Sequence, residues 1–184
     1  MANIFDFANF FIDLSLHNEE DPMTNLRLNK LLYFAQGCSF AKRGVPLFCE
    51  DFRAWKFGPV VPVVYHEFKK YEANPIDKVV GTYSPSVFSE DEFDILLNVA
   101  NEYGKYTSPT LVDIYHIPQG PWDIAYRHCV ESVIPKSDIK EYFQTNSCSS
   151  RFNSHRDSIQ TIYGRRDKDG YLVLPKELDS DWAL

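Results

Sequence analysis

Hydrophobic residues recur at intervals of three and four positions along most of the chain, a spacing that predicts amphipathic helices. The first such stretch covers residues 4–14. A second helix is expected between Thr24, whose side-chain oxygen can cap a helix, and Gly44, which suits the left-handed position after a helix. We expect the buried face of this second helix to consist of Leu28, Leu31, Leu32, Ala35 and Ser39.

More helices are predicted further along the chain. Pro62 suits the first turn of a helix, because the N–H that proline lacks would have no partner there. Ser89 and Glu92 have the spacing of a capping box, which predicts a helix over residues 89–103. Two further helices are expected after Ser108 and over residues 137–143, with a helical turn or two from Trp122 between them. The pattern therefore predicts about six helices.

Polar and apolar residues roughly alternate over residues 48–57, as in a half-buried β-strand. Gly58 and Pro59 are expected to end this strand. Helices and strand together predict an α+β fold, in which a mainly α-helical single domain contains a small β-sheet.

The composition changes sharply near Asn146, where serine and arginine become frequent and apolar residues become rare. We therefore predict one domain over residues 1–146 and a polar C-terminal extension over residues 147–184. Within the extension, residues 171–174 (Tyr-Leu-Val-Leu) are expected to form a short strand after a turn at Asp169 and Gly170. Such a strand can add to the sheet of its own domain or to the sheet of a partner.

Charge and cysteine usage narrow the class of protein. A net charge of −7 and a pI near 5.2 argue against broad nucleic-acid binding, which depends on basic groups that displace counterions from phosphates. The four cysteines lack metal-ligand spacing, and a chain of 184 residues does not need a disulfide framework. The apolar start contains Asp6 and Asp13, unlike a secretory signal, and no run of about 18 apolar residues occurs. We expect a cytoplasmic protein that does not enter a membrane.

Three histidines, His66, His116 and His128, are the candidates for acid–base catalysis. None of them belongs to a nucleophile motif, and the chain has no phosphate-binding glycine loop or metal-binding motif. We therefore predict no catalytic residues, no metal site and no cofactor. The alternative is a hydrolase or transferase that uses His66 or His116.

Four short runs between residues 28 and 65 carry a family resemblance. The run LNKLLYFAQG at residues 28–37 is followed by PLF at 46–48, AW at 54–55 and GPVVPVVY at 58–65. Together these blocks resemble the Panacea antitoxin domain, a family that also includes phage-associated, SocA-like proteins, and a weaker resemblance extends to residue 143. The resemblance implies an antitoxin that binds a cognate protein toxin and covers its working surface. Two alternatives are an adaptor that presents the toxin to a protease and a phage-associated regulator that binds a host protein.

Lysine, tyrosine and tryptophan residues gather around these blocks, and such side chains often anchor protein interfaces. For Lys30 a structural role stays open, because its stem can lie on an aromatic ring while its charge remains in water. The sequence carries no signal for the oligomeric state. The partner-binding residues that we predict are Lys30, Tyr33, Trp55, Tyr65, Trp122 and Tyr171.

Overall fold

The computed structural model describes residues 2–16, 22–104, 118–146, 165–166 and 172–173. Within these residues there are six α-helices: α1 (Ile4–Leu16), α2 (Asn25–Arg43), α3 (Pro62–Phe68), α4 (Glu90–Tyr103), α6 (Pro121–His128) and α7 (Lys136–Thr145). Two short 3-10 helices, η1 (Lys69–Tyr71) and η2 (Pro85–Val87), lie between α3 and α4. The mainly helical α+β class is confirmed. The helix expected after Ser108 lies outside the described residues, as do His116 and Tyr171.

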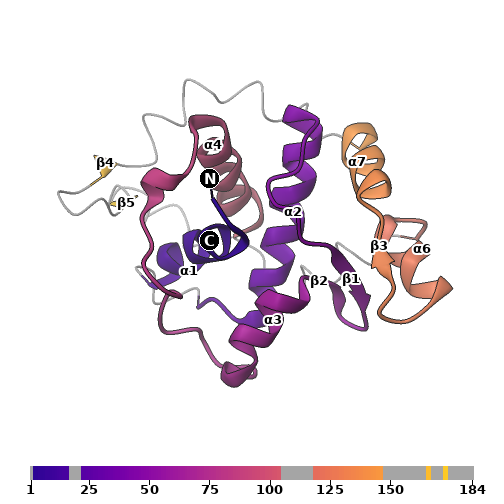
Figure 1. The fold of residues 1–184 in the computed structure, drawn as a ribbon, viewed down its shortest axis with the longest axis horizontal. Coiled ribbons are helices and arrows are strands. Elements are labelled where there is room, and N and C mark those ends of the chain that lie inside the picture. Colours follow the sequence, from indigo (N-terminus) through magenta and orange to yellow (C-terminus); the bar gives the residue numbers. More distant parts are fainter. Residues whose placement is uncertain (1, 17–21, 105–117, 147–164, 167–171, 174–184) are drawn as a thin grey trace, which may run out of the picture.

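Three short strands form an antiparallel sheet in the order β2-β1-β3, with β1 at Phe52–Trp55, β2 at Gly58–Val60 and β3 at Val133–Ile134. Figure 1 shows α2 in the middle of the molecule, with α1 and α4 on one side and the sheet, α6 and α7 on the other. Because α2 packs against α1, α3, α4, α7 and β2, it is the centre of the fold.

The ends and the buried face of α2 agree with the sequence. The Thr24 hydroxyl accepts a hydrogen bond from the Arg27 N–H, and Gly44 takes the left-handed conformation at φ +72° while it donates to the Phe40 carbonyl. All five residues predicted to form the buried face are buried: Leu28, Leu31, Leu32, Ala35 and Ser39.

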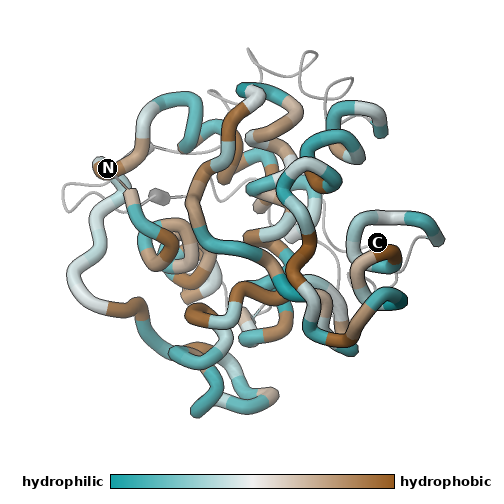
Figure 2. The backbone as a smooth tube through the Cα atoms, turned by 45° about the vertical axis from the view of Figure 1, so that its right-hand side comes forward, coloured by the Kyte–Doolittle hydropathy of each residue, from teal (hydrophilic) through white to brown (hydrophobic). Residues whose placement is uncertain are grey.

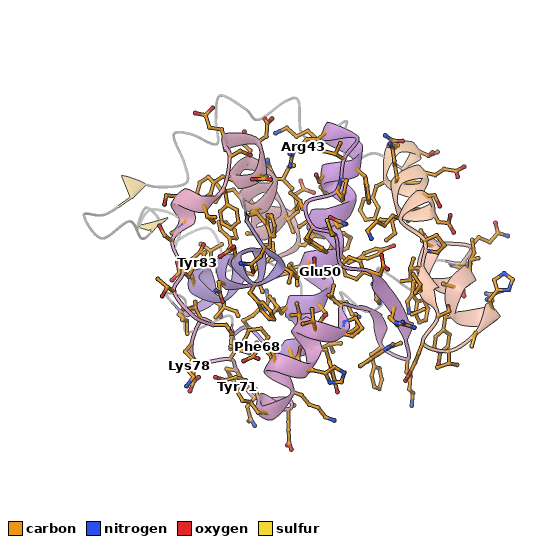
Figure 3. All side chains as sticks on the ribbon, in the orientation of Figure 1. Arg43, Glu50, Phe68, Tyr71, Lys78 and Tyr83 are labelled. Atoms are coloured by element: carbon orange, nitrogen blue, oxygen red, sulfur yellow. The ribbon has the colours of Figure 1, made fainter. Side chains whose placement is uncertain are left out.

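Aromatic side chains fill much of the core around α2. Phe7 and Phe11 of α1 are buried, and the Phe34 ring stacks on Tyr103 of α4 with their centroids 3.6 Å apart. Figure 2 shows hydrophobic and hydrophilic residues interleaved along the backbone, as expected for helices that each bury one side. At the C-terminal end of α2, Arg43 lies 3.5 Å from Glu92 of α4 (Figure 3), so the two helices also meet through charges.

Polar side chains of α2 are buried as well, and they bind the backbone of a neighbouring segment. Gln36 accepts a hydrogen bond from the Leu47 N–H at 2.8 Å and donates to the Phe48 carbonyl at 3.0 Å. Ser39 donates to the Val45 carbonyl at 2.8 Å. These two side chains satisfy the backbone of the segment that turns back along α2, and such backbone groups are costly to bury without a partner.

The strand predicted over residues 48–57 is shorter than expected, and β1 covers only Phe52–Trp55. The preceding residues do not extend the ladder, because Gln36 binds the backbone of residues 47 and 48 and Lys136 donates to the Cys49 carbonyl. Gly58 does not end the strand region either. It begins β2 and pairs with Trp55 across a two-residue turn, where its φ of +102° suits glycine.

In the C-terminal extension, β5 (Leu172–Val173) pairs with β4 (Arg165–Arg166) in antiparallel register. The two form a separate two-stranded sheet and do not extend the β2-β1-β3 sheet. The strand expected at residues 171–174 therefore pairs, over its described part, with another segment of the extension.

One substitution tests the polar contacts of α2. Asn29 accepts a hydrogen bond from the Val61 N–H at 2.9 Å, so Asn29→Leu leaves that buried N–H without an acceptor. We expect a loss of about 1–3 kcal/mol in the free energy of unfolding, measured by urea denaturation. The matched control is Asn98→Leu, because the Asn98 amide donates to a carbonyl of its own helix, that of Asp94. Equal losses for both variants would contradict the role assigned to Asn29.

Candidate functional site

An aromatic cluster lies where the β1–β2 hairpin meets α3. The Trp55 ring contacts the Tyr65 ring edge-on, with centroids 4.7 Å apart, and lies 6.3 Å from the ring of His66. Figure 1 shows the hairpin and α3 side by side. Trp55 and Tyr65 are half-buried and His66 is exposed, so the cluster reaches the surface. The Trp55 indole N–H is itself buried and has no hydrogen-bond partner among the described residues.

Trp122 supports the hairpin from the side of α6. Its indole N–H donates to the Trp55 carbonyl at 2.9 Å, and its ring stacks on Tyr126 at 4.9 Å. Trp122 is itself buried. Its contribution to the site is therefore to fix the position of Trp55.

Two asparagines of α2 hold the chain after the hairpin. Asn25 donates to the Tyr65 carbonyl at 3.0 Å, and Asn29 accepts from Val61 at the start of α3. The Asn29 amide also donates to Asn25, so the two side chains orient each other. Tyr65 is consequently fixed to the same helix that carries the core.

Lys30 lies under the hairpin and is fully buried, with 0% of its surface exposed. Its ammonium nitrogen donates to the Pro59 carbonyl at 3.2 Å. A Cβ at Gly58 would meet this nitrogen, so a side chain there would require the end of Lys30 to shift, and the φ of +102° also favours glycine. Burial lowers the pKa of Lys30 from 10.5 to about 7, because an ammonium group loses its hydration there.

Tyr33, one turn further along α2, belongs to the core. Its ring lies 5.1 Å from Phe52 of β1 and 5.6 Å from Phe143 of α7, both edge-on. Burial raises the pKa of Tyr33, and the charges of Tyr142 and Asp138 add to this shift. Tyr33 therefore connects the inner face of the sheet to α7.

Five of the six predicted partner-binding residues lie in the part of the chain that the structure describes. Trp55 and Tyr65 reach the surface, whereas Trp122, Lys30 and Tyr33 lie beneath it. Tyr171 is outside the described residues. Of these five side chains, only those of Trp55 and Tyr65 are accessible from the surface.

The sequence prediction missed two exposed apolar residues beside this cluster, Phe57 and Val63, which expose 57% and 45% of their surface. Phe57 lies in the turn of the hairpin and Val63 in the first turn of α3. The available signal was the position of Phe57 immediately before Gly58 and Pro59, since large apolar residues are unusual in turns. The alternation of polar and apolar residues over 48–57 instead predicts a strand at Phe57.

Within the described ranges, no three histidine, cysteine, aspartate or glutamate side chains form a group that could hold a metal ion. His66 and His128 are exposed on α3 and at the end of α6. Among the described residues no helix is long and apolar enough to span a bilayer.

Comparison with known proteins identifies the class of this chain. It belongs to the antitoxin SocA-like, Panacea domain family, whose model matches residues 28–123. This match begins within α2, includes the hairpin and α3, and ends within α6. Antitoxin SocA from Caulobacter vibrioides (strain NA1000 / CB15N) is 38% identical over 112 residues, which cover 56% of this chain and 60% of that protein. The chain thus spans less than two thirds of the length of this relative. No solved structure matches the chain.

The buried lysine generates a pH-dependence prediction. In the unfolded chain Lys30 keeps its proton up to a pKa near 10.5, whereas the folded chain releases it near 7, so the unfolded state binds more protons between these values. Stability relative to Lys30→Met should therefore rise with pH above 7, by about 1.4 kcal/mol per pH unit. Below pH 7 the difference should become constant.

The measurement is urea denaturation at several pH values between 6 and 9.5. Lys42→Met removes an exposed lysine from the same helix and serves as the control, which should keep the slope of the unmodified chain. A Lys30→Met variant whose stability followed that of the unmodified chain at every pH would contradict the assignment.

Proposed function

We propose that this chain is an antitoxin that neutralises a cognate protein toxin by direct binding. The observation that carries the proposal is the match of residues 28–123 to the antitoxin SocA-like, Panacea domain family. The relative named Antitoxin SocA supports the same function. On this proposal the protein acts as a binding partner, and no bond of the toxin is made or broken.

The geometry of the hairpin and α3 suits this role. Tyrosine and tryptophan are enriched at protein interfaces because they combine a large apolar area with a polar group. Trp55 and Tyr65 expose part of their ring area at the surface, and hydrogen bonds from Trp122 and Asn25 hold the backbone of both. A surface that is already ordered loses little entropy when it binds.

Two mechanisms are compatible with neutralisation by binding. In occlusion the antitoxin covers the working surface of the toxin, with an interface of roughly 800 Å² per partner if its size is standard. In delivery the antitoxin presents the toxin to a protease and is then released. We propose occlusion as the primary mechanism, since it needs no third component.

A titration distinguishes these mechanisms. The candidate toxin is the protein encoded by the reading frame adjacent to that of this chain. Purified chain is added to it in steps, and its residual activity is measured. Occlusion predicts that activity falls in proportion to the chain added and ends at a fixed stoichiometric ratio. This end point should not change with incubation time or with added protease.

Neutralisation by far less than a stoichiometric amount of chain would contradict occlusion. If that result needs a protease and ATP, it supports delivery; if it needs neither, it supports an enzyme. A wild-type chain that neither binds nor neutralises the neighbouring protein would overturn the proposed function itself.

We further propose that residues 1–146 form the antitoxin domain. Because β5 pairs with β4 and not with the β2-β1-β3 sheet, a chain that ends at Asn146 should keep the melting temperature of the full chain. Thermal denaturation monitored by circular dichroism measures this. A fall of more than about 4 °C, roughly 1–2 kcal/mol for a chain of this size, would show that the extension stabilises the domain.

A further inference from the structure

We propose that the toxin binds at one surface, which consists of Trp55, Lys56, Phe57, Val63 and Tyr65 and is called here the hairpin–helix surface. Phe57 is its central anchor and enters an apolar pocket of the toxin whose rim is acidic. This inference rests on the proposed function, because it names the surface through which neutralisation takes place.

The first observation is apolar exposure. Phe57 is 57% exposed, and Val63 lies one helical turn before His66, whose ring lies next to Trp55. Phe57 follows Trp55 by two residues in the hairpin, and Val63 lies on the helix whose Tyr65 contacts Trp55, so exposed apolar and half-buried aromatic residues share these two elements. Exposed apolar patches mark interaction sites. A turn needs no phenylalanine for its own geometry, so the exposure of Phe57 has no structural benefit.

The second observation is rigidity beneath the surface. Lys30 donates to Pro59, Val61 donates to Asn29, and Trp122 donates to the Trp55 carbonyl. These bonds come from α2 on one side and α6 on the other, so the short hairpin is held at both of its strands. Such an ordered hairpin presents Phe57 in one position, which favours insertion into a pocket.

The third observation is charge. The chain carries a net charge of −7, yet the charged residues of the hairpin, Arg53 and Lys56, are both basic. The Lys56 ammonium lies 5.3 Å above the Phe57 ring, and within the described residues it forms no ion pair.

Two acidic residues near the hairpin have basic partners: Asp51 pairs with Lys136, and Glu67 of α3 lies 3.8 Å from Lys70. The charge next to Phe57 in the turn, that of Lys56, is positive. This positive charge is complementary to acidic groups around the proposed pocket of the toxin.

The experiment measures binding of full-length variants to the protein encoded by the adjacent reading frame, which is the probe. We expect Phe57→Ser to weaken the equilibrium association by more than about tenfold, as for a truncated interface anchor. Circular dichroism and the melting temperature should remain those of the unmodified chain, because Phe57 is largely exposed.

Val45→Ser is the matched control. Val45 is also 45% exposed, like Val63, but it follows the opposite end of α2, beside Ser39. We expect Val45→Ser to bind like the unmodified chain and Val63→Ser to bind more weakly. Equal binding by Phe57→Ser, Val63→Ser and the unmodified chain would overturn the hairpin–helix surface while leaving the proposed function intact.

Charge reversal tests the acidic rim separately. Lys56→Glu should slow association at low salt and make the association rate rise with added salt, opposite to the salt dependence of the unmodified chain. An association rate unaffected by Lys56→Glu would overturn the acidic rim.

A second copy of this chain is the competing occupant of the surface. The mass of the unmodified chain and of Phe57→Ser in solution, measured by light scattering, decides this point. If the unmodified chain is a dimer that Phe57→Ser converts to a monomer, the surface is a self-association site and the inference is wrong. An identical mass for both supports the toxin as occupant.

Discussion

The fold depends on one helix that supplies hydrogen bonds to a chain segment lacking its own. Residues 45–65 run back along α2 as turns, two short strands and the start of α3, and their buried backbone groups cannot all pair in a sheet of three short strands. Asn25, Asn29, Gln36 and Ser39 provide the missing partners from the side of α2. These amide and hydroxyl groups fix the hairpin and α3 more closely than apolar packing could, because hydrogen bonds require defined directions. The core and the exposed aromatic cluster are therefore parts of a single arrangement.

Burial of the Lys30 ammonium group costs more free energy than burial of the amides beside it. An amide that is buried with its partners costs little, whereas a buried ammonium group loses hydration that one carbonyl only partly replaces. The contact nevertheless brings the Gly58 backbone against α2, where a Cβ would displace the end of the Lys30 side chain. The run LNKLLYFAQG lies within the family match and contains Asn29, Lys30 and Gln36, which bind the hairpin and the segments on either side of it. The exposed residues Phe57 and Val63 lie in the segment that follows.

Sequence patterns predicted correctly the features that depend on residues a few positions apart, such as the ends of helices. Thr24 and Gly44 at the ends of α2, and the capping box of Ser89 and Glu92, act on backbone groups a few residues away. Helical periodicity could not reveal the roles of Asn29 and Gln36, because it assigns polar residues to the solvent side and cannot see which segment will cover them. The length of the strand was overestimated for the same reason, since the backbone of residues 47–49 binds side chains of α2 and α7. In the candidate site, the sequence pointed to Trp55 and Tyr65, which are half-buried. It did not point to Phe57, because the alternation over residues 48–57 predicts a strand where the structure has a turn.

The sheet contains a strand that arrives late in the sequence. Arg53 of β1 donates to the Glu131 carbonyl just before β3, a contact between residues 78 positions apart. During synthesis α2 and the β1–β2 hairpin leave the ribosome well before β3, and until then one edge of β1 has no strand beside it. Contacts between such distant residues slow folding, and an open strand edge can pair with other chains. A product that stops early, or that is cut between α4 and α6, would keep the hairpin but lack the strand that covers it. Interrupted translation therefore yields a fragment exposed to aggregation and proteolysis, even though it contains most of the residues by which the family is recognised.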